Sequence, residues 1–153
     1  LTLICMGLKL VKGEGKMGNK LFISCPMLGR TREAIEESMK VMHEEAEKRF
    51  GKKLEVIDTY IEEDAPEEVV NAPVWYVGES IKMLSQADYF IGVDITKYGL
   101  YNNRCYPGCA VEEFTAEMYD IPMKILVCDE FACFKDMEEL REKFARKIAL
   151  NMV

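Results

Sequence analysis

Two adjacent carboxylates, Glu112 and Glu113, stand where the sequence predicts that a loop becomes a helix. Pro107 and Gly108 stop any preceding element, and the apolar residues after them recur at helical spacing. The loop follows the strand-like run 88–94, so the first helical turn should lie beside the carboxyl end of a buried strand. Open α/β sheets bind their ligands at that edge. An acidic pair there could act on a ligand, although acids in a first turn also simply complement the helix dipole.

A second group of candidate residues lies in the turn after the first strand-like run. Residues 20–25 read Lys-Leu-Phe-Ile-Ser-Cys, and Pro26 ends the run. Ser24, Cys25 and Arg30 could hold a phosphate group, because turn amides and a helix N-terminus suit an anion. The turn lacks the glycine density of a phosphate loop, so these residues could equally serve only the turn itself.

Apolar runs and chain breakers predict the elements that position these residues. The predicted strands are 20–25, 54–57, 88–94 and 124–128, and the predicted helices are 29–50, 75–87, 109–119 and 135–150. This alternation predicts one small, doubly wound α/β domain, flavodoxin-like or Rossmann-like, with a parallel sheet and helices on both faces. Residues 59–74 are rich in acids and prolines, which predicts an exposed loop that acts as a lid.

Composition limits the partners. The chain has 153 residues, of which 49% are hydrophobic and 31% charged, so it can bury a core of its own. A net charge of -7 disfavours a nucleic-acid backbone or an anionic membrane as partner. No apolar run approaches the roughly 20 residues of a membrane helix. Isolated basic contacts to a single phosphate group stay possible.

The cysteines do not follow a metal-binding pattern. Cys105 and Cys109, and likewise Cys128 and Cys133, match no familiar zinc spacing, and the single histidine, His43, is distant in sequence. We therefore expect no metal, no cofactor and reduced cysteines, as in a cytoplasmic protein.

The first residues pose a separate question. Met17 stands just before the first convincing strand, and residues 13–16 could be encoded by a purine-rich stretch that resembles a bacterial ribosome-binding site. We expect Met17 to be the natural start, residues 1–16 to be upstream sequence or an accessory arm, and residues 17–153 to form the domain.

The order of these motifs resembles the nucleoside 2-deoxyribosyltransferase family, which also contains deoxynucleoside-monophosphate N-glycosidases. The similarity runs from about residue 20 to residue 128 and covers most of the predicted core. Its most specific element is the Gly-x-x-x-Glu-x-x-x-Ala spacing of Gly108, Glu112 and Ala116. The other parts are residues 22–30, the strand that opens with Ala87-Asp88, and Ile121-Pro122.

The resemblance implies that Glu112 is a nucleophile and that Asp88 is a second catalytic acid or orienting group. Cleavage of an N-glycosidic bond develops oxocarbenium character at the anomeric carbon, which a carboxylate can trap covalently while a second acid assists base departure. Water as acceptor gives hydrolysis, and a second base gives transfer. The resemblance also implies a homo-oligomer, most simply a dimer. It further implies a small-molecule nucleoside or nucleotide as the substrate. The candidate substrate-binding residues are Ser24, Cys25, Met27, Gly29, Arg30, Asp94, Gly108 and Tyr106.

The chain departs from the family pattern around the nucleophile. Ala110-Val111 stands where many members have a small residue such as glycine just before the glutamate, and Glu113 replaces a small or apolar residue after it. Tyr106 takes the place of an aspartate that some transferases carry, and side chains of the loop 98–106 could replace its contact to the base. Two alternatives therefore stay open: a non-catalytic nucleotide-binding or sensing module, and an N-glycosidase acting on a nicotinamide dinucleotide.

Overall fold

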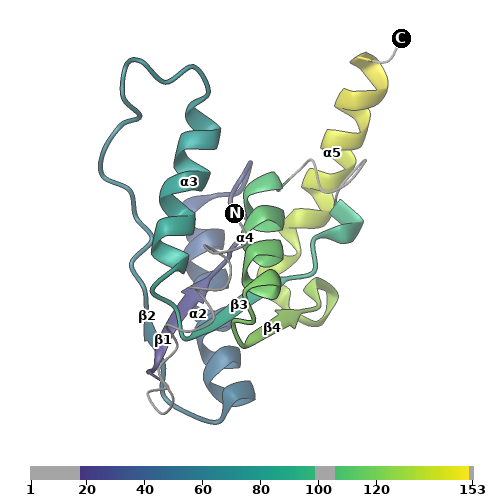
Figure 1. Cartoon of the computed structure of the whole chain (residues 1–153). Coiled ribbons are helices and arrows are strands. Elements are labelled where there is room, and N and C mark those ends of the chain that lie inside the picture. The colour runs from purple at the N-terminus through teal and green to yellow at the C-terminus, as the bar shows by residue number, and fades with distance from the viewer. Residues whose placement is uncertain (1–17, 99–105, 152–153) are drawn as a thin grey trace.

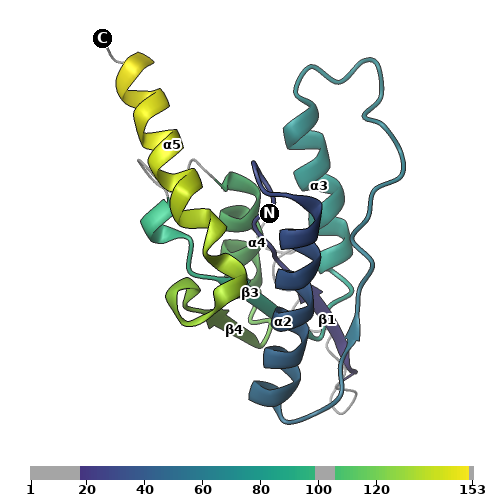
Figure 2. The same cartoon turned by 180° about the vertical axis from the view of Figure 1, so that it is seen from behind.

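A parallel sheet between two layers of helices forms the protein (Figures 1 and 2). The computed structural model describes residues 18–98 and 106–151. The proposed accessory arm, residues 1–16, and most of the loop 98–106 lie outside the described residues. Helices on both faces of an all-parallel sheet confirm the predicted small, doubly wound α/β fold.

The strands are β1 (Lys20–Ile23), β2 (Glu55–Val56), β3 (Tyr89–Val93) and β4 (Met123–Leu126). Their order in the sheet is β2-β1-β3-β4, which matches the first four strands of the flavodoxin-like arrangement. All five residues of β3 are buried, as expected for the centre of a sheet that is covered on both faces. Between β1 and β3 the strand order reverses, and such a switch point is where open α/β sheets bind ligands.

The four long helices are α2 (Arg32–Phe50), α3 (Ala72–Leu84), α4 (Pro107–Met118) and α5 (Asp136–Asn151). Short 3₁₀ turns follow β3 and β4 at η1 (Thr96–Tyr98), η2 (Cys128–Glu130) and η3 (Ala132–Phe134). α2 begins where the Thr31 hydroxyl accepts from the Ala34 N–H, and it ends at Gly51, whose φ of 68° is left-handed.

α3 differs from the prediction by a shift of three residues at each end. It begins at Ala72 because the Asn71 side chain caps the Val74 N–H and Pro73 fits a first helical turn. It ends at Leu84 instead of residue 87. The expected loop is therefore shorter at its end, and no regular element occurs between residues 57 and 71. Figure 1 shows this segment as a long excursion beside α3. Its action as a lid stays a prediction.

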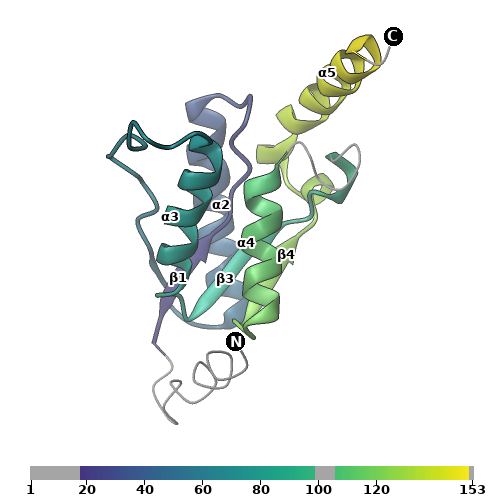
Figure 3. The same ribbon diagram turned by 45° about the horizontal axis from the view of Figure 1, so that its top comes forward.

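Each face of the sheet has its own core. α2, η3 and the first turn of α5 lie on one face, where Met42, Ala46 and Met137 are fully buried. α3 and α4 lie side by side on the other face, where Leu84 and Ala116 pack near Phe22 and Phe90. Figure 3 shows α3 and α4 together, with α5 projecting away from the sheet. The carboxyl ends of β1 and β3 open toward the start of α4.

Candidate functional site

Glu112 on α4 is held between two serines from different elements. The Ser24 hydroxyl donates to its Oε2 at 2.5 Å, and the Ser80 hydroxyl donates to its Oε1 at 2.6 Å. Ser24 follows β1 directly, and Ser80 lies on α3. One side chain each from the strand end, α3 and α4 therefore meets at the carboxyl edge of the sheet.

Local structure accounts for this meeting. Backbone pairing continues one residue beyond β1, because the Ser24 N–H donates to the carbonyl of Ile91 at 2.9 Å, and Ser24 is only 3% exposed. Pro107 lies in the first turn of α4 and fixes where the helix begins. Four residues after Glu112, Ala116 is fully buried, which places both on the side of α4 that faces the sheet.

Opposing effects act on the acidity of Glu112. Burial raises the pKa of its carboxyl, and the hydrogen bonds from Ser24 and Ser80 lower it, with burial the larger effect. Its neighbour Glu113 also has a raised pKa, because it is partly buried and is repelled by Asp94 and Glu117. The two adjacent carboxylates that the sequence singled out thus have different surroundings.

Asp94 lies at the same edge, one residue after β3. Its Oδ1 accepts from the Thr96 backbone N–H at 3.0 Å and from the Thr96 hydroxyl at 2.6 Å. These two bonds lower its pKa, so Asp94 is ionised at neutral pH. Ser24, Asp94 and Glu112 are the predicted site residues that the structure brings to the switch point.

Asp88, expected to be a second catalytic acid or orienting group, lies at the opposite end of the sheet from Glu112. Its Oδ2 accepts from the backbone N–H of Lys20 at 3.0 Å, and its own N–H donates to the Lys20 carbonyl at 2.9 Å. Lys20 opens β1, whereas Ser24 follows the end of the same strand. The length of the sheet therefore separates Asp88 from Glu112, and Asp88 cannot assist Glu112 within one chain.

Arg30 was also misassigned as a phosphate ligand. Its guanidinium is fully buried, and its Nε and Nη2 donate to the Asp136 carboxylate at 2.8 and 3.1 Å. The same group donates to Pro26 O at 2.9 Å, Ser38 Oγ at 2.7 Å and Cys133 O at 2.9 Å. Protein acceptors thus surround the guanidinium, which ties the turn after β1 to η3 and to α5.

The remaining turn residues do not present polar side chains to the site. Burial raises the pKa of the Cys25 thiol to about 11, so it is a neutral, packed side chain. Met27 is exposed. Gly29 has a φ of 78°, and a Cβ there would lie 3.2 Å from Leu140 Cδ2, so its role is in the backbone of the turn.

At the start of α4, Tyr106 is buried, and its hydroxyl lies 3.5 Å from the carbonyl oxygen of Leu28, at the limit for a hydrogen bond. A Cβ on Gly108 would meet only Val77, at an ordinary contact distance of 3.7 Å. Burial raises the pKa of the neighbouring Cys109 thiol to about 12, which excludes a thiolate nucleophile at neutral pH. Of these side chains near the start of α4, Glu112 is the candidate nucleophile.

Ser80 is the site residue that sequence reasoning missed. It is a polar residue in a largely apolar helix, three residues after Val77 and four before the fully buried Leu84. That spacing places a hydroxyl on the inward face of the predicted helix, which is a signal that the sequence contains.

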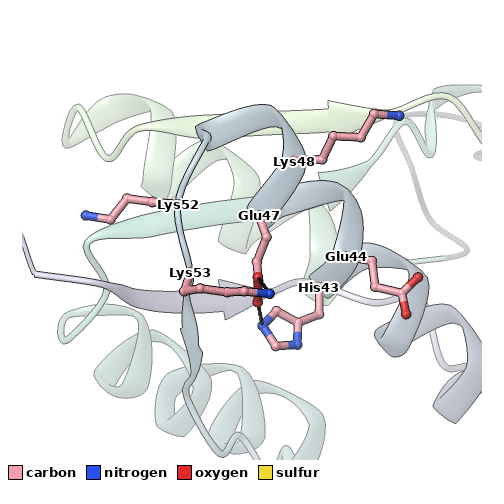
Figure 4. A pocket seen from close by; sticks show the side chains of 6 residues that line it. All are labelled: His43, Glu44, Glu47, Lys48, Lys52 and Lys53. Carbon is pink, nitrogen blue, oxygen red and sulfur yellow. Dashed lines mark ion pairs between the residues drawn. The ribbon is translucent and has the colours of Figure 1, made fainter.

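The described residues contain a hollow elsewhere, at the end of α2 (Figure 4). Lys53 and His43 both point to Glu47 there, at 2.8 and 3.0 Å, and Lys52 donates to the carbonyl of Gly18. Gly18 precedes β1, so this hollow lies at the amino edge of the sheet. It is open and remote from Glu112, and two of its charged groups, Lys53 and Glu47, pair with each other.

Comparisons with models of protein families, with curated proteins and with solved structures found no match to this chain. Within residues 18–98 and 106–151, no three His, Cys, Asp or Glu side chains gather as a metal site requires. No helix in that part of the chain is long and apolar enough to cross a membrane.

Proposed function

We propose that this protein cleaves or transfers the N-glycosidic bond of (deoxy)nucleosides or their 5′-monophosphates, with Glu112 as the nucleophile. The observation that supports it most is a partly buried carboxylate with one serine donor on each oxygen, at the switch point of an open α/β sheet. The motif resemblance independently assigns the nucleophile to the same residue.

The proposed reaction has two steps. A carboxylate oxygen of Glu112 bonds to the anomeric carbon while the carbon–nitrogen bond breaks and its electron pair leaves with the base. The base takes a proton from solvent. Water or a second base then attacks the same carbon, releases the Glu112 carboxylate and loses a proton to solvent.

Release of free base from a panel of compounds tests the proposal. The panel contains purine and pyrimidine nucleosides with and without a 2′-hydroxyl, their 5′-monophosphates and a nicotinamide dinucleotide, with and without a second base as acceptor. Chromatography should detect free base from at least one nucleoside or monophosphate. If free base is released from the dinucleotide and from no other compound, the substrate is a nicotinamide dinucleotide and not a nucleoside or monophosphate. Tight binding without base release from any compound would contradict the proposal and favour a sensing module.

We also propose that the protein works in a reducing compartment, the cytoplasm, and that it self-associates. Cys25, Cys109 and Cys133 are thiols that form no disulfide. Burial raises the pKa of each of them, which suits packing and not redox chemistry.

A further inference from the structure

We propose that Ser24 and Ser80 are positioning residues that hold the Glu112 carboxylate in one orientation and in its ionised form. The two hydroxyls reach opposite oxygens of the carboxylate, at 2.5 and 2.6 Å. This role goes beyond the proposed function, on which it rests for its purpose, because it explains how a partly buried carboxylate stays usable when the described residues that contact it supply neutral hydroxyl donors.

The geometry fixes the carboxylate in two ways. Ser24 and Ser80 lie 88 and 32 residues from Glu112 in the chain, so the arrangement depends on the packing of α3 and α4 against the sheet. Each serine has a single hydroxyl proton, and that proton is committed to Glu112. A carboxylate offers about four lone-pair positions, so two donors orient it and leave about half of them for an incoming carbon.

The surroundings make the hydroxyls important for charge. Burial disfavours the ionised form of Glu112, and the serine hydrogen bonds oppose burial. The nearby thiols of Cys109 and Cys25 have pKa values raised to about 12 and about 11, so they stay neutral. Beside Ser80, Glu79 pairs with Lys82 at 2.6 Å. Among the described residues, the adjacent Glu113 is itself an acid, and Asp94 raises its pKa further, so it supplies no positive charge.

Ser24→Ala and Ser80→Ala test this role, with Ser24→Thr and Ser80→Thr as variants that keep the hydroxyl. Ser85→Ala is the matched control, because the Ser85 hydroxyl bonds the Lys82 carbonyl at the end of the same helix and does not touch Glu112. The first measurement follows the pH titration of the Glu112 carboxyl by NMR in protein labelled with ¹³C-glutamate, with Glu112→Gln to assign the signal. The second follows base release against pH.

Each alanine variant should raise the pKa of Glu112 and move the acid limb of the activity profile to higher pH. It should also lower kcat/KM by roughly ten- to a hundredfold, the loss expected for one hydrogen bond to a charged group. The threonine variants should keep the pKa of Glu112 and the value of kcat/KM close to those of the wild type, and Ser85→Ala should change neither quantity. A Glu112 titration that is identical in the wild type and both alanine variants would overturn the role, even if Glu112 proves to be the nucleophile. Shifted titrations in a protein without base release would keep the positioning role and reject the proposed function.

Discussion

At Glu112, burial and hydrogen bonding act on one carboxylate in opposite directions. Burial against the sheet edge raises its pKa, and the hydroxyls of Ser24 and Ser80 lower it. A nucleophile needs the ionised form, yet a carboxylate that is too well solvated attacks poorly. The two serine hydroxyls favour the ionised carboxylate and carry no charge of their own. A cation in their place would repel the positive charge that develops at the anomeric carbon.

The raised pKa of Glu112 predicts the acid side of the pH profile. The ionised form is the active one, so activity should fall as the pH drops through the folded-state pKa. Because burial raises that pKa, the half-maximal point should lie above the ordinary range of a glutamate. Initial rates of base release, measured across the pH range under kcat/KM conditions, check this. A limb within the ordinary glutamate range would contradict it.

The same shift predicts how stability depends on pH. Between the lower pKa of Glu112 in the unfolded chain and its raised pKa in the fold, the folded state binds more protons, so stability falls as pH rises through this window. Glu112→Gln removes this loss. Urea unfolding at acidic and neutral pH should therefore show the variant gaining stability relative to the wild type as pH increases. A difference that does not change with pH would argue against the raised pKa.

The outcomes at single residues show what the sequence contained. Pro107 and Gly108 locate the helix start after a buried strand, which places the acidic pair at the sheet edge, and the resemblance singles out Glu112 from that pair. The catalytic role given to Asp88 was wrong, and its place at the start of a predicted strand already indicated this. A residue that opens a parallel strand lies at the amino edge of the sheet, opposite the edge where Glu112 lies. The spacing of Ser80 indicates an inward-facing hydroxyl, but its partner Glu112 could not be predicted, because the contact forms only when α3 and α4 pack side by side.

Among the elements, the turn between β1 and α2 depends on a contact that no local pattern reveals. Arg30 reaches Asp136, which lies 106 residues later at the start of α5. Strand and helix positions follow from apolar spacing within each element, so most of them could be predicted. The partner of a buried cation follows from the arrangement of several elements together, and it could not.

Loss of the Arg30 contact should destabilise the fold. Arg30→Met leaves Asp136, Ser38 Oγ and the Pro26 carbonyl without the hydrogen bonds that Arg30 donates. We expect a loss of about 3 kcal/mol in the free energy of unfolding, measured in urea. Arg32→Met is the control, because Arg32 is exposed and pairs only along the helix with Glu36. It should leave the unfolding midpoint unchanged. Equal effects of the two variants would show that Arg30 is not a structural link.

At the scale of the whole molecule, the face of α4 that points away from the core is apolar. Val111, Phe114 and Met118 are 43%, 63% and 61% exposed at helical spacing. By contrast, α2 and α5 present many charged side chains on the other side of the sheet. Three adjoining apolar side chains without charge among them can meet their own copy across a two-fold axis without like-charge repulsion.

We therefore expect a homodimer that uses this face of α4. Light scattering at micromolar concentration should give about twice the chain mass of 17.6 kDa. Phe114→Glu should return the mass to that of one chain, whereas Tyr60→Glu, at a residue that is 75% exposed on the loop before α3, should not. A wild-type mass of one chain would contradict the prediction.

The most direct test of the account compares Glu112→Gln with Glu113→Gln in base release and searches for a covalent intermediate. An amide keeps the shape of the side chain but cannot attack, so Glu112→Gln should fold, bind ligand and lose activity by roughly a thousandfold or more. Glu113 points about 100° further round the helix, so its variant should lose far less. Mass spectrometry of the quenched wild type should find a glycosyl adduct on the peptide that contains Glu112. Unchanged base release by Glu112→Gln would contradict the central claim.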